Sequence, residues 1–271
     1  MAFRRSGVRI PSGPPIATIV FAAVWFAAAA SLAVRGLLEE LVLAGFTGVV
    51  VMIAIVLTFA LTPHPPPGVR RRDARTAAQA MLLIAVVLFS FVRFGPPWLT
   101  HMTGWGYLPG WAYLVVVFLL PMVAVFALGA RPKEIGLQRG YRSFAVAGVW
   151  IGLRGLMLAP AIMAGKGLWL AGMGVLHLVG VAFPEELIFR GLLQTRLSLL
   201  VGSAWAVVLT ALLFGLWHFG INTTAYGGDW ATAAARSVLV QGTVGLGYCV
   251  ALERTRSLIA PSLAHAAFNA N

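Results

Sequence analysis

The chain has 271 residues, of which 60% are hydrophobic and 10% charged, and its mean hydropathy is +0.89. A soluble domain carries about 25% charged residues, so this composition excludes a water-soluble globule and predicts an integral membrane protein. Because unpaired backbone cannot cross lipid, the fold must be a helix bundle or a closed barrel. The apolar runs are continuous over about 20 residues and do not alternate with polar residues. They predict an all-α polytopic transmembrane helix bundle of about eight to nine helices.

The formal net charge of +12 comes from short basic clusters between the apolar runs. In such positions basic residues set membrane orientation and meet anionic lipid headgroups. We therefore expect the lipid bilayer as a partner and no nucleic acid. The single cysteine, Cys249, excludes an intrachain disulfide and a cysteine-based metal site.

The N-terminal half begins with residues 1–15, which we predict to be a cytoplasmic segment. The apolar run that follows is too long and unbroken for a signal-peptide core, so it indicates a first membrane helix. Membrane helices are predicted throughout 16–162. Their expected bounds are Ile16–Val34, Val42–Leu61, Thr76–Phe94, Trp111–Leu128 and Ser143–Ile162.

A second membrane domain is predicted over residues 168–271. It should contain a long helix near Leu168–Leu200, a return helix Ser203–Phe219, a span Ser237–Leu252 and a last helix from about Ser257. We find no internal repeat in the sequence and no segment with the composition of a soluble domain.

Basic residues alternate between the loops. They precede span one (Arg4, Arg5, Arg9), span three (Arg70, Arg71, Arg72, Arg75), span five (Arg131, Lys133, Arg139, Arg142) and the last helix (Arg254, Arg256). The loop Gly95–Gly110 carries no charge besides a possible contribution from His101. By the positive-inside rule, the N-terminus is cytoplasmic in a multi-pass protein of the plasma membrane. Trp98, Trp105, Tyr107 and Trp111 then predict an aromatic belt on the outer face.

Ionisable residues in the apolar C-terminal region predict a chemical site, since such residues are costly at bilayer depth. Glu186 and Arg190 are four residues apart, the spacing of a helical ion pair with Glu on the favourable N-terminal side. Glu185 points about 100° away and has no partner at that spacing. A carboxylate in that position suits a general base or acid, and Glu186 with Arg190 a structural and electrostatic role.

Two histidines complete the predicted site. If the chain turns near Val201-Gly202, Glu186 and His218 each lie about 16 residues from the turn, at the same depth of an antiparallel hairpin. Phe214 shares the helix face of His218. His265 and Asn269 share a face of the last helix, and a neutral imidazole and a carboxamide can both donate hydrogen bonds to an oxyanion.

Three motifs appear in order: Glu-Glu-x-x-x-Arg at 185–190, Phe-x-x-x-His at 214–218 and His-x-x-x-Asn at 265–269. Together they resemble those of the CPBP family, which groups type II CAAX prenyl endopeptidases with bacterial proteases linked to bacteriocin processing and self-immunity. The resemblance covers about Leu168–Asn271 and makes 168–271 a CPBP-like catalytic domain. It implies an intramembrane endopeptidase in which glutamate and histidine activate water and His265 and Asn269 lie near the oxyanion. The substrate would be a peptide or a membrane protein.

Several alternatives stay open at this level. Glu185, His218 and His265 could form a zinc site, in keeping with the frequent description of such families as metalloproteases, but no His-Glu-x-x-His is present. We therefore assign no metal ligand, with zinc as the alternative. The competing functions are a non-catalytic membrane scaffold or bacteriocin immunity protein and a proton-coupled transporter. The Ala-, Gly- and Arg-rich composition indicates a bacterial protein.

Overall fold

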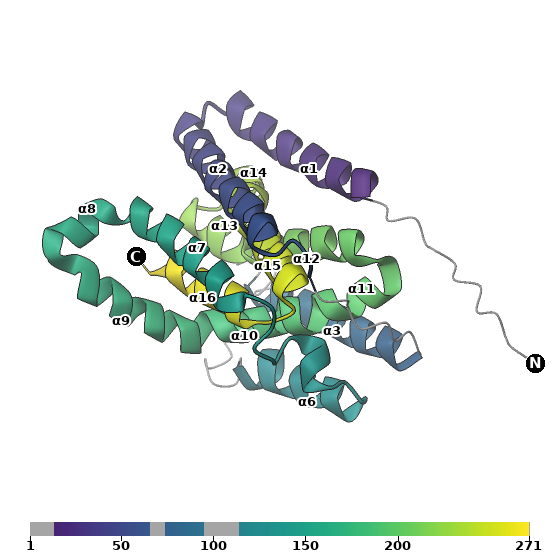
Figure 1. Ribbon diagram of the computed structural model, residues 1–271. Coiled ribbons are helices and arrows are strands. Elements are labelled where there is room, and N and C mark those ends of the chain that lie inside the picture. Colours follow the sequence, from purple (N-terminus) through teal and green to yellow (C-terminus); the bar gives the residue numbers. More distant parts are fainter. Residues whose placement is uncertain (1–13, 66–73, 95–113, 271) are drawn as a thin grey trace, which may run out of the picture.

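The described residues of the computed structural model are 14–65, 74–94 and 114–270 (Figure 1). They are largely helical and contain no β-strand, which confirms the predicted all-α bundle. Five runs are long and apolar enough to cross a membrane: Ile16–Val34, Leu38–Leu61, Ala159–Val201, Ser203–Ala225 and Trp230–Thr255. The predicted arginine cluster of residues 4–9 and the aromatic belt of residues 98–111 lie outside the described residues.

The N-terminal half follows the predicted order of spans. Its helices are α1 (Pro14–Val34), α2 (Leu38–Leu61), α3 (Ala74–Phe94), a π-helical segment η1 (Leu114–Leu119) continued by α6 (Leu120–Ala127), a short 3₁₀ helix η2 (Pro132–Ile135) and α7 (Ser143–Met157). The fifth span ends at Met157 and not at the predicted Ile162. Pro160 follows within three residues, and a proline cannot donate the backbone hydrogen bond that would continue the helix.

The C-terminal half begins with one long helical run that carries the acidic residues. It comprises α8 (Ala159–Ala161), η3 (Ile162–Lys166), α9 (Gly167–His177), η4 (Leu178–Ala182), α10 (Phe183–Glu186), η5 (Leu187–Gln194) and α11 (Thr195–Val201). Gly165, with φ 82°, bends the run near its start. The segments η3, η4 and η5 are π-helical, and π-helical turns are frequent at functional sites.

The return helix starts directly after Gly202, where the sequence predicts a turn. Gly202 has φ 88°, a conformation that only glycine adopts without strain. The remaining elements are α12 (Ser203–Trp217), α13 (Phe219–Ala225), α14 (Trp230–Arg236), π-helical η6 (Ser237–Gly242), α15 (Thr243–Thr255) and α16 (Ile259–Asn269). The predicted hairpin of α11 and α12 is thereby confirmed.

Polar contacts hold both ends of α2. At its N-terminal end, Glu40 pairs with Arg236 and accepts a hydrogen bond from the hydroxyl of Tyr226. Burial, together with this bond to the Glu40 carboxylate, raises the pKa of Tyr226 to about 12. At its C-terminal end, Thr62 accepts hydrogen bonds from Arg254. We call this second end the basic end, since the basic clusters of residues 131–142 and 254–256 lie there.

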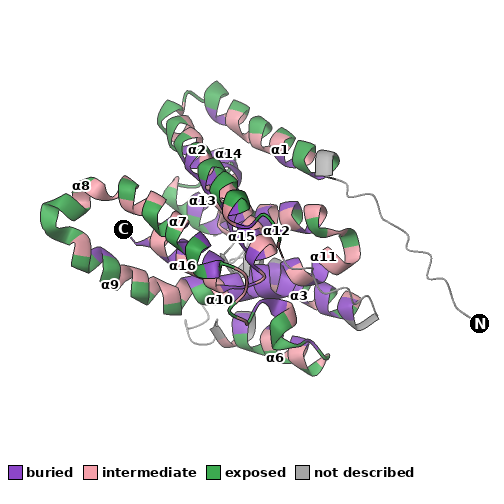
Figure 2. Ribbon diagram, viewed as in Figure 1, coloured by how far each residue is buried: buried purple, intermediate pink, exposed green. Residues whose placement is uncertain are grey.

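The buried core lies around α10, η5, α12, α15 and α16, whereas much of α1, α2, α8 and α9 is exposed (Figure 2). Exposed apolar side chains on these outer helices, such as Phe26, Val49 and Leu168, fit contact with lipid chains. Of the predicted site residues, Glu186, Arg190 and His265 are buried in this core, and Glu185, His218 and Asn269 are partly buried.

Candidate active site

Glu186 is the centre of the polar cluster. It ends α10, and its side chain is completely buried. Its Oε1 accepts a hydrogen bond from Arg190 Nη1 at 3.0 Å and another from His265 Nδ1 at 2.9 Å. Arg190 also donates from Nη2 to the carbonyl oxygen of Gly245 at 3.1 Å. One ion pair therefore links α10 and η5 to both α15 and α16.

Aromatic rings surround the buried guanidinium. Its central carbon lies 4.1 Å from the ring centroid of Phe214 and 5.3 Å from that of Tyr248, within the range of cation–π attraction. A Cβ added to Gly245 would lie 2.9 Å from Phe214 and 3.2 Å from Arg190 Nη2. Glycine at this position lets α15 approach closely enough for its backbone to bind the arginine.

Glu185 is held less tightly than its neighbour. It is partly buried, and its Oε2 lies 3.8 Å from His265 Nε2. That distance is too long for a hydrogen bond, and Oε2 makes none with any described residue. As expected, Glu185 has no partner at helical spacing. His265, on α16, lies close to it in the structure.

His218 lies where α12 ends and α13 begins. Its Nδ1 is 2.8 Å from the carbonyl oxygen of Phe214, and because a carbonyl only accepts, Nδ1–H is the donor. The Nε2 of the neutral ring then carries a lone pair. His218 lies within electrostatic range of Glu185 and His265, and Phe214 contacts both imidazoles, with ring centroids 4.8 and 5.7 Å apart. The hairpin therefore brings His218 to the acidic pair.

For His265, as for His218, the hydrogen-bond acceptor determines which ring nitrogen carries the hydrogen. Glu186 Oε1 accepts a hydrogen bond from Arg190, and we assign it as the acceptor from His265 Nδ1–H as well. A neutral ring then has no second N–H, contrary to the expectation that a neutral imidazole donates to an oxyanion. Donation from Nε2 requires the doubly protonated ring. Asn269, the last residue of α16, lies on the same helix face by its spacing of four residues.

Tyr248 is a part of this cluster that no sequence motif indicates. It is fully buried on α15 and stacks on His265, with ring centroids 5.1 Å apart and 25° between the ring planes. Its only sequence signal is a phenol inside an apolar span, on the same helix face as Gly245. Both residues contact site residues only because α15 packs against η5 and α16.

Four buried polar atoms of the cluster make no hydrogen bond with a described residue. They are Glu185 Oε2, Glu186 Oε2, Arg190 Nε and Tyr248 Oη. Buried polar groups are nearly always satisfied by protein or ordered water. Both acceptors and donors are left over, so the cluster suits a water molecule or a polar part of a substrate.

An apolar cavity of about 480 Å³ flanks the cluster between α7, α9 and α16. Ala266 and Ala270, which follow His265 and Asn269 in the chain, lie on its wall together with Arg154. The cavity therefore lies alongside α16, the helix that carries His265. Among the described residues, no three His, Cys, Asp or Glu side chains are grouped so that they could hold a metal ion.

Comparison with known families agrees with this geometry. Residues 167–271 match the family model described as type II CAAX prenyl endopeptidase Rce1-like. This region belongs to the CPBP family. The matched range contains all six predicted site residues, and at family level the match indicates an intramembrane CAAX-type protease for this region. Neither a curated protein nor a solved structure matches the chain.

Proposed function

We propose that this CPBP protein is an endopeptidase that hydrolyses a peptide bond inside the membrane with water activated by Glu185 and His218. The observation that carries the proposal is the orientation of His265. Glu186, itself held by Arg190, accepts from His265 Nδ1, so that Nε2 faces Glu185. The Glu185 carboxylate and His265 Nε2 thereby face each other in the site, and His218 lies within electrostatic range of both residues.

The reaction would proceed as follows. Glu185 takes a proton from a water that also donates to His218 Nε2, and the oxygen attacks the carbonyl carbon of the substrate. The C–O bond forms, and the carbonyl oxygen becomes an oxyanion. When the C–N bond breaks, the proton held by Glu185 passes to the leaving amine. The products are a carboxylic acid and an amine.

Stabilisation of the oxyanion is assigned to His265 and Asn269. The Asn269 carboxamide carries two N–H donors. His265 can donate from Nε2 only as an imidazolium, and the carboxylates of Glu186 and Glu185 face its two nitrogens. Hydrogen-bond donors of this kind typically accelerate acyl transfer about 100- to 1,000-fold each.

The proposed substrate is a peptide or membrane protein that enters from the bilayer, with an apolar segment in the cavity beside α16. We place the protein in the plasma membrane of a bacterium. Its N-terminus and its basic end face the cytoplasm, because the loops with most Lys and Arg stay on that side. The short turn between α1 and α2 makes these helices antiparallel, so α1 starts at the basic end, where α2 finishes.

The proposal assigns no metal to the site, and zinc held by Glu185, His218 and His265 is the alternative. Cleavage of apolar peptides by the purified full chain in nanodiscs, with and without a chelator, tests both. We expect activity to survive chelation and to fall at least 100-fold in Glu185→Gln, His218→Ala and His265→Ala. Loss on chelation that zinc restores would make these side chains metal ligands.

His177→Ala is the matched control. This histidine lies on α9 and bonds the carbonyl oxygen of Met173, so its removal should leave cleavage unchanged. A Glu185→Gln protein with full activity toward a cleaved substrate would refute the mechanism. The contacts of Glu186 would serve a non-catalytic scaffold or immunity protein equally well, and that function predicts a folded protein without cleavage.

A further inference from the structure

A polar cavity of about 650 Å³ lies at the basic end, separate from the Glu–His cluster. It is formed where η2 and the loop after it meet α11 and the C-terminal end of α15. Its charged wall residues are Lys133, Glu134, Arg196, Glu253 and Arg256. Three cations therefore face two carboxylates.

Each carboxylate already has an arginine partner. Arg196 Nη1 lies 3.4 Å from Glu134 Oε2, and Arg256 binds both oxygens of Glu253 at 2.9 Å. Lys133 is exposed and forms no ion pair with any described residue. Its ammonium group is thus the cation that remains for an incoming anion.

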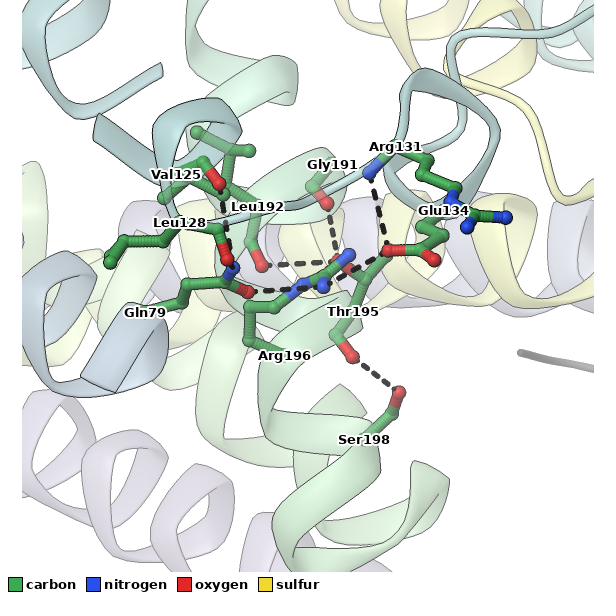
Figure 3. A network of polar contacts seen from close by, with 10 residues as sticks. All are labelled: Gln79, Val125, Leu128, Arg131, Glu134, Gly191, Leu192, Thr195, Arg196 and Ser198. Atoms are coloured by element: carbon green, nitrogen blue, oxygen red, sulfur yellow. Dashed lines mark hydrogen bonds and ion pairs between the residues drawn. The ribbon is translucent and has the colours of Figure 1, made fainter. Parts of the chain in front are cut away.

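The wall on the α11 side is rigidly built (Figure 3). Arg196 is 3% exposed and also donates to Gln79 Oε1 on α3 at 3.1 Å. Gln79 in turn donates to the carbonyl oxygens of Val125 and Leu128, at 3.4 and 3.1 Å. One arginine thus connects α3, the end of α6, η2 and α11, which preorganises the cavity.

Gln194 contributes a second buried polar group to the wall. It is 1% exposed and donates from Nε2 to the carbonyl oxygen of Cys249 at 3.0 Å, while its Oε1 has no hydrogen-bond partner among the described residues. A buried acceptor of this kind is normally satisfied by water or a ligand. The cavity therefore offers an acceptor in addition to its cations, as a hydroxyl-bearing anion would require.

We propose that this cavity binds the phosphate-bearing headgroup of an anionic phospholipid from the leaflet at the basic end. Its volume falls within the range of small-molecule sites, about 300–1,000 Å³. Basic pockets between membrane helices on the cytoplasmic side favour such headgroups. The phosphate lies against Lys133, headgroup hydroxyls reach Gln194 Oε1, and Leu199 and Leu252 on the same wall contact the glycerol and upper acyl region.

Thermal unfolding of the full chain in neutral detergent, titrated with phosphatidylglycerol or phosphatidylcholine, tests the proposal. Phosphatidylglycerol should raise the unfolding midpoint, and phosphatidylcholine should not. Lys133→Gln should weaken the apparent affinity for phosphatidylglycerol about fivefold, the effect of one basic residue near an anionic lipid. Arg139→Gln is the matched control, an exposed cation on the same connector that does not line the cavity. It should change the affinity by less than about twofold.

Three results would overturn the proposal. Equal weakening in both variants would mean a diffuse attraction of the basic end for anionic lipid. The absence of any response to phosphatidylglycerol would exclude the headgroup altogether. A third arm uses glycerol 3-phosphate without lipid. One outcome is that glycerol 3-phosphate raises the unfolding midpoint in a Lys133-dependent way, with no further increase from phosphatidylglycerol. In that case the ligand of the cavity would be a soluble phosphate ester and not a lipid.

Discussion

Glu186 accepts hydrogen bonds from two side chains through a single oxygen, and both partners are buried with it. Arg190→Met would leave the carboxylate with His265 alone. Breaking a buried ion pair by removing one partner costs about 3–5 kcal/mol, because the other charge stays behind uncompensated. We expect the free energy of unfolding in detergent to fall by that amount, measured by denaturant titration.

Arg256→Met is the control for Arg190→Met. Its pair with Glu253 leaves about a quarter of each side chain exposed, and such pairs contribute at most about 1 kcal/mol. A similar decrease in the free energy of unfolding in the two variants would mean that Arg190 is accessible to water in the folded protein. The Glu186–Arg190 pair could not then orient His265.

At the residue scale, spacing in the sequence predicts pairs within a helix but not contacts between helices. The Glu186–Arg190 pair follows from four-residue spacing. The bond from His265 to Glu186 joins residues 79 apart and depends on how α16 packs. Tyr248 is missed for the same reason, since an aromatic residue in an apolar helix is ordinarily a core residue and only packing places it on His265.

Helix α12 approaches η6 so closely that a glycine is needed at position 215. A Cβ on Gly215 would lie 2.5 Å from the carbonyl oxygen of Ser237 and 3.0 Å from the Cα of Gly242. We expect Gly215→Ala to destabilise the protein by about 1–3 kcal/mol, as overpacking does. Because Phe214 and His218 flank this position, peptide cleavage should fall as well. Thermal unfolding and cleavage rates measure both effects.

Gly148→Ala provides the comparison on α7, where an added Cβ would meet no atom within 4 Å. It should leave stability unchanged or raise it by up to about 1 kcal/mol, the difference in helix propensity between the two residues. If Gly215→Ala behaved like Gly148→Ala, α12 and η6 would have room to separate. The position of His218 would then not depend on their crossing.

At the element scale, hydropathy predicts where helices exist and turn chemistry predicts where they reverse. Gly202 and the long run before it follow from the sequence. The π-helical segments around Glu185 do not, because they depend on hydrogen-bond register and not on composition. The predicted end of the fifth span at Ile162 follows the apolar run, whereas α7 ends at Met157, three residues before Pro160.

At the scale of the whole molecule, the sequence predicts an all-α membrane bundle and an excess of basic residues at alternate loops. It does not predict which helices are neighbours. The contact of the α1–α2 turn with the loop after α13 joins Arg35 to Asp229, 194 residues apart. Such pairings between distant exposed charges leave no periodic trace in the chain.

This distant contact predicts a specific dependence on pH. The Thr232 hydroxyl donates to Asp229, and with Arg35 nearby the pKa of the Asp229 carboxyl lies below its usual value. A carboxyl with a lowered pKa in the folded state contributes stability above its unfolded pKa of about 3.9. That contribution is lost as pH falls through the folded value. Asp229→Asn removes the charge, while asparagine still caps the N-terminus of α14.

We therefore expect the thermal midpoint of wild type to exceed that of Asp229→Asn at neutral pH, with a difference that shrinks toward zero below about pH 4. Midpoints recorded from pH 7 to pH 3 measure it. Thr232→Val should show a smaller loss that is complete at a higher pH than in wild type, since it lacks the hydroxyl that stabilises the carboxylate most. A difference between wild type and Asp229→Asn that stays constant over this range would show that capping geometry, and not charge, makes the link between the two loops.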